Sequence, residues 1–162
     1  MSNHAFIKPT RPITHDKITK ILEDLNQNRF KNCLRIEYEE GGWGEHTWAI
    51  TGITANDPEF SYDTVICWLN EDGTFEIRHP SGYMFIWWVD FSVMNAVALE
   101  FEGDWTDDGD DKTQKGDPAK YTNFREFLLN DMWGHVPKPN KAFLLKHEMV
   151  GTPPEHVFEL EE

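Results

Sequence analysis

The sequence predicts an α+β fold in which an antiparallel sheet of five or six strands packs against two helices. Short runs with β-type patterning follow one another from residue 33 to about 102, with tight-turn sequences between them. Apolar residues recur at helical spacing near both ends of the chain. Hairpin turns between neighbouring strands favour a meander. A length of 162 residues suits one domain covering the whole chain.

The N-terminal region predicts an extended lead-in followed by a helix. Pro9 and Pro12 disfavour helix around them, so residues 1–13 are expected to be extended. Thr14 is a suitable N-cap for a helix over 15–28. The apolar face of that helix is formed by Ile18, Ile21, Leu22 and Leu25.

The middle of the chain predicts the strands. Apolar and polar residues alternate after Asn32, and Asp72-Gly73 between two β-like runs is a strong hairpin signal. Residues 83–91 are apolar on both faces, which predicts a central strand with Trp87 and Trp88 on opposite sides. The expected strands cover residues 33–40, 46–55, 62–69, 74–79, 83–91 and 95–102.

The C-terminal third predicts a solvated loop, a helix and a tail. Residues 103–120 contain one aromatic residue and many acids, so we expect an exposed loop. Asn123 and Glu126 have capping-box spacing at the start of a helix near 123–132. A short strand or turn is expected at 142–145. An acidic tail, 152–162, is expected to pack through Val157, Phe158 and Leu160.

The negative charge is concentrated in one central block. Residues 36–111 hold 18 Asp and Glu but a single basic residue, Arg78, which gives a net charge of −17. The remainder holds 14 Lys and Arg against 11 acids, so the whole chain has a net charge of −14. Such a block repels itself, and it is complementary to a positive surface. It argues against direct binding of nucleic acid or of an anionic membrane.

Cysteine usage and the N-terminal sequence indicate a cytoplasmic protein. Cys33 and Cys67 each lie in an apolar run, which favours buried free thiols in a reducing compartment over a disulfide. The first residues lack an apolar stretch long enough for a signal peptide, and no run of the chain is long enough to span a bilayer.

The sequence carries weak signals for metal binding and for catalysis. The acidic loop from Asp104 resembles an EF-hand loop at its first positions, but Lys115 stands where a bidentate Glu is required. We therefore predict no metal and no cofactor. His46 beside a turn, or His79 near Asp90 and the acids at 100 and 102, could form a His–carboxylate site, although most such pairs are structural.

The charge pattern favours a binding function over an enzymatic one. We expect an acidic protein that blocks a basic surface on a nuclease or another nucleic-acid-binding protein, as a phage anti-defence inhibitor or a toxin-immunity protein. The alternatives are a small enzyme that uses a His–carboxylate site and an accessory virion structural protein. Trp43 and Trp105 lie in expected loops and are predicted as exposed apolar anchors. The predicted partner-binding residues are Glu37, Glu39, Trp43, Glu45, Glu100, Glu102, Asp104, Trp105, Asp107, Asp108, Asp110 and Asp111.

Overall fold

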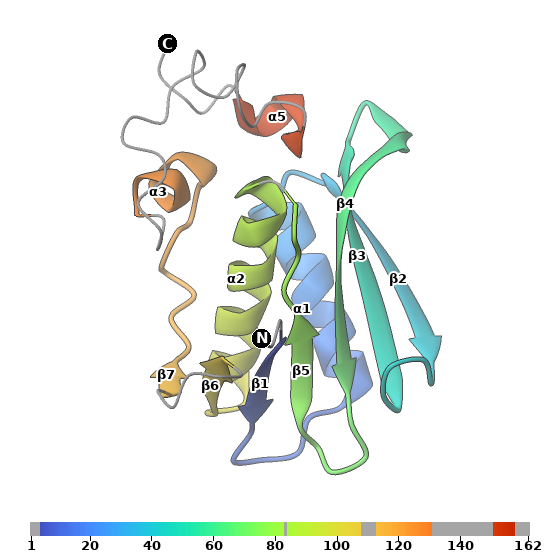
Figure 1. Cartoon of the computed structure of the whole chain (residues 1–162), viewed down its shortest axis with the longest axis vertical. Coiled ribbons are helices and arrows are strands. Elements are labelled where there is room, and N and C mark those ends of the chain that lie inside the picture. Colours follow the sequence, from blue (N-terminus) through green and yellow to red (C-terminus); the bar gives the residue numbers. More distant parts are fainter. Residues whose placement is uncertain (1–3, 83, 108–112, 131–150, 158–162) are drawn as a thin grey trace.

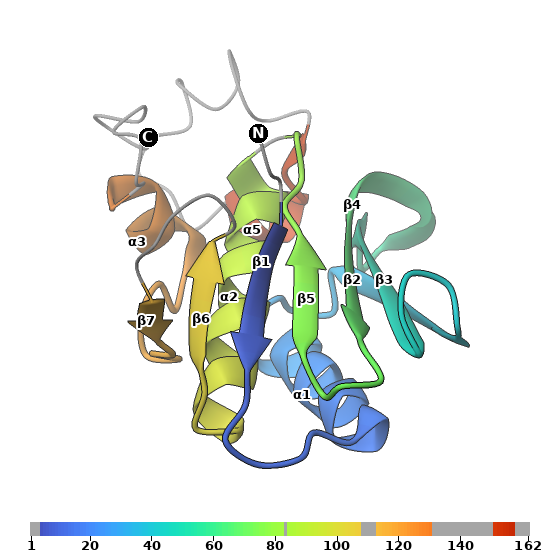
Figure 2. The ribbon, with the colours of Figure 1, turned by 60° about the horizontal axis from the view of Figure 1, so that its bottom comes forward.

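A seven-stranded antiparallel sheet with its main helices, α1 and α2, on one face forms the described part of the chain (Figures 1 and 2). The structure is a computed structural model and describes residues 4–82, 84–107, 113–130 and 151–157. The α+β prediction is confirmed, with seven strands in the order β2-β3-β4-β5-β1-β6-β7. The elements are β1 (His4–Lys8), α1 (His15–Asn28), β2 (Leu34–Glu40), β3 (His46–Thr54), β4 (Asp57–Leu69), β5 (Phe75–Arg78), α2 (Met84–Glu100), β6 (Asp104–Asp107), β7 (Thr113–Lys115), α3 (Phe124–Leu129) and α5 (Pro154–Val157).

Locally encoded elements agree with the sequence prediction. Thr14 accepts a hydrogen bond from the Lys17 amide at the start of α1, and Asn123 accepts one from the Glu126 amide at the start of α3. The four strands β2 to β5 form the expected meander. β4 begins at Asp57, earlier than expected. Pro58 is compatible with this start, because a proline at the beginning of a strand removes no essential hydrogen bond of the sheet.

β1 is a strand inside the sheet, so the prediction of an extended lead-in was incomplete. It pairs antiparallel with β5 on one side and with β6 on the other (Figure 2). Ala5 and Ile7 are fully buried, whereas Phe6 between them is on the other face and half-buried. Five residues of alternating polarity can form a strand. That β1 has a strand partner on each side is evident only from the positions of β5 and β6 in the fold.

The predicted strands at 83–91 and 95–102 were wrong, because residues 84–100 form the helix α2. Twelve of its seventeen residues are buried, so the helix is apolar around most of its circumference. Such a helix has no polar face to mark the 3.6-residue period, and its apolar run resembles a buried strand. Trp88 is fully buried, while Trp87 is half-buried against His79.

The predicted loop at 103–120 contains the strands β6 and β7, so that prediction was wrong for these segments. Trp105 in β6 is 3% exposed and packs edge-to-face against Phe91 of α2, which removes it from the predicted exposed anchors. Pairing with β1 and the burial of Trp105 against α2 together hold this polar segment in the sheet. Residues 108–112 and the expected strand or turn at 142–145 lie outside the described residues.

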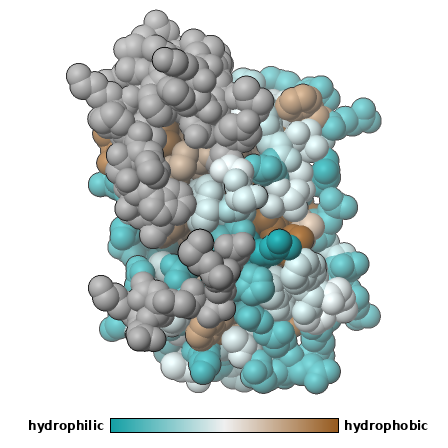
Figure 3. All heavy atoms as spheres, in the orientation of Figure 1, coloured by the Kyte–Doolittle hydropathy of each residue, from teal (hydrophilic) through white to brown (hydrophobic). Residues whose placement is uncertain are grey.

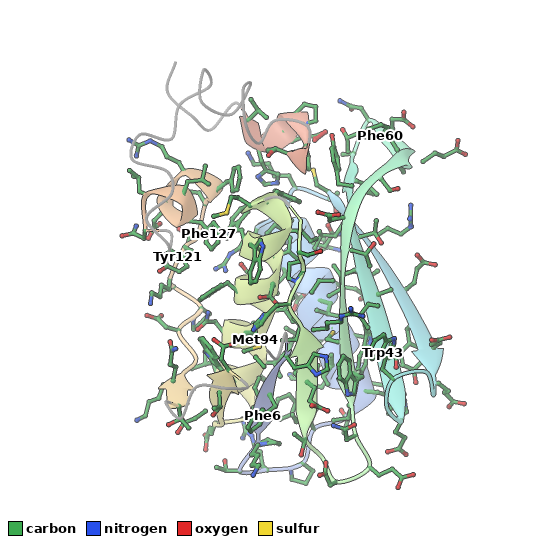
Figure 4. The ribbon with its side chains drawn as sticks, in the orientation of Figure 1. Phe6, Trp43, Phe60, Met94, Tyr121 and Phe127 are labelled. Carbon is green, nitrogen blue, oxygen red and sulfur yellow. The ribbon has the colours of Figure 1, made fainter. Side chains whose placement is uncertain are left out.

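The core lies between the sheet and the helices. A row of helix-facing residues crosses six strands through Tyr38, Trp48, Cys67, Ile77, Ala5 and Asp107. Phe127 of α3 and Tyr121, which precedes that helix, extend the core toward Phe91 on α2 (Figure 4). The tail packs as expected at Val157, which is buried in α5, while Phe158 and Leu160 lie outside the described residues.

Candidate functional site

The predicted acidic residues divide into two groups at opposite sides of the sheet. Glu37, Glu39 and Glu45 lie on β2 and the turn that follows it, whereas Asp104 lies on β6. Five strand spacings separate β2 from β6, which is about 24 Å at ~4.8 Å per strand. The two groups therefore form separate clusters on the sheet.

The group on β2 is exposed and contains aromatic residues. We use the name β2 patch for Glu37, Tyr38, Glu39, Glu40, Trp43 and Glu45. All four carboxylates are exposed, and Tyr38 and Trp43 are 40% and 48% exposed. Arg35 forms the ion pair with Glu37 at 3.2 Å, so the patch retains three carboxylates without an ion pair among the described residues. Hydrophilic residues line this margin of the molecule in Figure 3.

The turn between β2 and β3 holds Trp43 in a fixed position. Gly41 and Gly42 have φ of 83° and 80°, a conformation that glycine adopts without strain. The Thr47 hydroxyl donates to the Gly41 carbonyl at 2.6 Å and accepts from the Trp43 amide at 3.0 Å. This arrangement closes the turn and directs Trp43 back over the sheet (Figure 4).

Trp43 lies on an aromatic platform formed by the open face of the sheet. Its ring stacks on Trp68 of β4, with 5.2 Å between ring centroids, and the Arg78 guanidinium lies 5.3 Å from its centroid. The Trp68 indole donates to Glu76 at 2.9 Å, which fixes the lower ring. Trp43 therefore combines exposure with a rigid support, as an apolar anchor for a partner requires.

Tyr38 belongs to a second ring stack on the other face of the sheet. His15 and His46 stack with 4.2 Å between centroids, and Tyr38 stacks on both. The Tyr38 hydroxyl is 2.5 Å from His46 Nδ1. The predicted catalytic candidate His46 thus supports Tyr38 at the edge of the sheet.

A groove of about 920 Å³ extends the β2 patch past the ends of the strands. Its wall includes the carboxylates of Asp16, Glu45, Glu71 and Asp72, together with Lys8 and Arg11. The acids outnumber the bases, so the groove continues the negative surface around the end of the sheet.

The acidic group near β6 is more strongly engaged within the protein. Lys17 forms an ion pair with Glu100 at 3.0 Å, and the Arg11 side chain donates to the Glu100 carbonyl. Glu102 and Asp104 are exposed, but their neighbour Trp105 is buried. Asp108, Asp110 and Asp111 lie outside the described residues.

His79 is held between two carboxylates contributed by a helix and a strand. His79 Nδ1 lies 2.8 Å from Asp90 Oδ2, and its Nε2 lies 2.5 Å from Asp107 Oδ1. Asp90 was expected near His79, whereas the predicted neighbours at 100 and 102 are replaced by Asp107. Asp107 reaches the site because β1 places β6 two strands from β5 on the same sheet face.

The charges of this cluster stabilise an imidazolium. Burial alone lowers the pKa of His79, but hydrogen bonds to Asp107 and Asp90 and their charges outweigh it and raise the pKa to about 10. Burial raises the pKa of Asp90, whose side chain is 1% exposed. A doubly protonated imidazole donates from both nitrogens and has no lone pair to accept a proton from a substrate. The cluster therefore has the form of a structural clamp.

Both cysteines are buried free thiols, as predicted. Burial and contact with Glu155 raise the pKa of Cys33 to about 12, and burial raises the pKa of Cys67 as well. Both groups therefore remain neutral thiols at pH 7, which disfavours a nucleophilic role.

Comparisons with known protein families, with curated proteins and with solved structures found no match to this chain. Within the described residues, no group of three or more His, Cys, Asp or Glu side chains has the arrangement of a metal site. No helix in the same part of the chain is long and apolar enough to cross a membrane.

Proposed function

We propose that this protein binds a basic, nucleic-acid-binding surface of another protein through the β2 patch and thereby blocks it. The observation that carries the proposal is the coincidence of exposed carboxylates with a supported, exposed tryptophan on one edge of the sheet. Carboxylates steer association with a positive partner, and a buried aromatic anchor slows dissociation. A phage anti-defence inhibitor and a toxin-immunity protein both fit this chemistry.

Several physical features favour this side of the sheet over the β6 side. Of the two predicted anchors, Trp43 is exposed and Trp105 is buried. The acids near β2 therefore have an exposed apolar anchor beside them, whereas Trp105 cannot serve the acids near β6 in this way. Glu100 is already paired with Lys17. The groove beside Glu45 adds acids that can receive lysine or arginine side chains from a partner.

The geometry of His79 favours binding over the enzymatic alternative. Both ring nitrogens are engaged by carboxylates, and the raised pKa keeps the ring charged at pH 7. A general base needs a free lone pair near the operating pH.

A charge-reversal experiment with a matched control tests the proposal. The test variant changes Glu37, Glu39, Glu40 and Glu45 to Lys. The control variant changes Glu23, Asp24, Asp57 and Glu59 to Lys, which alters the net charge by the same amount away from the β2 patch and the groove beside it. Both proteins, checked for folding by circular dichroism, are used with the wild type to capture partners from lysate of the encoding organism at low salt.

The decisive measurement uses the purified captured partner. We expect the test variant to associate at least about tenfold more slowly, with a flatter salt dependence, because several exposed charges act together on the association rate. Trp43→Ala should instead speed dissociation. The wild type should release nucleic acid from the partner. Equal binding and equal release by the test and control variants would refute the proposal.

A further inference from the structure

The β2 strand has one side without a strand partner in the described structure. It pairs with β3 from Leu34↔Gly52 to Glu40↔His46, and it stands at the end of the strand order. The Gly41 amide donates to the Glu45 carbonyl, and the Ile53 amide donates to the Cys33 carbonyl. These two bonds show that the main-chain groups of odd-numbered residues in this register point toward β3. Those of even-numbered residues therefore point away from the sheet.

The outward amide and carbonyl groups of β2 are hydrogen-bonded at one end of the strand and lack a hydrogen-bond partner along the rest of it among the described residues. The Asn26 side chain accepts from the Leu34 amide at 3.0 Å and donates to the Leu34 carbonyl at 3.1 Å, as a neighbouring strand would. Ile36, Tyr38 and Glu40 follow at the outward positions. Their outward amide and carbonyl groups have no hydrogen-bond partner among the described residues.

Two different rows of side chains flank this open edge. Glu37 and Glu39 lie on the open face of the sheet, whereas Ile36 and Tyr38 lie on the face that packs against α1. Ile36 is half-buried and Tyr38 is 40% exposed, so each leaves apolar surface at the edge. A strand added here would meet carboxylates on one face and apolar groups on the other.

We propose that the partner adds an extended segment to the β2 edge in which basic residues alternate with apolar residues. This inference rests on the proposed function and specifies how the partner is held. The basic side chains pair with Glu39 and with Glu37, whose exposed ion pair with Arg35 is exchanged for one with the partner. The apolar side chains cover Ile36 and Tyr38, and the main chain bonds to Ile36, Tyr38 and Glu40. A second copy of β2 is the wrong occupant, because it would bring like charges opposite one another.

A pair of substitutions at Tyr38 isolates the main-chain bond. Tyr38→Pro removes an outward amide and leaves the ladder with β3 intact, which edge strands tolerate. Tyr38→Val loses the same aromatic ring but keeps the amide, so it is the matched control. We expect Tyr38→Pro to bind the captured partner about tenfold more weakly than Tyr38→Val, from the loss of main-chain bonding at the edge.

A defined peptide provides a readout that does not require the natural partner. The probe is a capped heptapeptide of alternating lysine and valine, compared with one of alternating glutamate and valine. The lysine peptide should slow amide exchange at Ile36 and Glu40 in the Tyr38→Val protein, and the glutamate peptide should not. Equal partner affinity of the two Tyr38 variants, or equal effects of the two peptides, would overturn strand addition. If charge reversal abolishes partner binding but the Tyr38 variants bind equally, the blocking function stands and side chains alone make the contact.

Discussion

His79 links three elements through one charged ring, and its titration should be visible in the stability of the protein. Its pKa is about 10 in the folded state and has the ordinary value of 6.5 when unfolded. The imidazolium therefore contributes its full stabilisation below pH 6.5, and this contribution is lost as the pH rises through about 10. Replacing His79 by Gln leaves Asp90 and Asp107 without a charged partner and should cost about 3–5 kcal/mol at pH 7.

Urea unfolding of the wild type and His79→Gln between pH 7 and pH 10 measures this effect. The difference in unfolding free energy should shrink as the pH rises, because the wild type loses the imidazolium proton of His79 over this range. A difference that stays constant over this range would show that the ring is not charged in the folded protein.

Trp88 and Trp43 provide a contrast between a core tryptophan and a surface one. Trp88 is fully buried, and its indole donates to the Tyr121 carbonyl at 2.7 Å. Trp88→Ala should lower the unfolding free energy by about 3–5 kcal/mol, because it leaves a cavity and an unpaired carbonyl. Trp43→Ala should cost within about 1 kcal/mol, because half of the ring is already in water. Similar losses in the two variants, measured by urea unfolding, would contradict this assignment of the core.

At the scale of the element, β1 decides whether the sheet is continuous. It joins the β2–β5 meander to β6, so its inward side chains should be essential to stability. Ile7→Ala should cost about 2–4 kcal/mol, because the side chain is fully buried. Phe6→Ala, on the open face of the same strand, should cost about 1 kcal/mol. If thermal unfolding shows that the two substitutions have equal and small effects, the N-terminal segment does not pair as described.

At the scale of the whole molecule, the net charge of −14 should make stability depend on salt. Raising the salt concentration to about 0.1 M shortens the screening length to about 10 Å and weakens repulsion between the acids. The melting temperature of the wild type should therefore rise with added sodium chloride. The four-residue reversal in the β2 patch replaces −1 by +1 at each position, which changes the net charge to −6. With added sodium chloride, the melting temperature of this variant should rise less than that of the wild type.

The control reversal, with the same net charge, tells whether clustering matters. Its four positions are divided between α1 and β4, so relief of local repulsion should be weaker. Its salt dependence should therefore lie between those of the wild type and the β2 variant. Identical curves for all three proteins would show that the β2 patch carries no special electrostatic strain.

The sequence determined the features that depend on residues a few positions apart. Thr14 and Asn123 mark the starts of helices, because each side chain accepts a hydrogen bond from the amide three residues later. The helical spacing of apolar residues predicts α1. Alternation along β2 to β5 and the Asp72-Gly73 turn predict the meander in the same way. The excess of acids in the central block is likewise a property of the sequence itself.

Tertiary structure alone decided which segments pair across long distances and which are enclosed. α2 is buried on most sides, so its sequence lacks the polar face that distinguishes a helix from a buried strand. β1 and β6 are short, and each is stabilised by strands distant in sequence. Their pairing buries Trp105 and brings Asp107 to His79. The same strand order leaves β2 at the edge of the sheet. Strand order depends on how the whole chain buries its core, and the local spacing of apolar residues does not encode it.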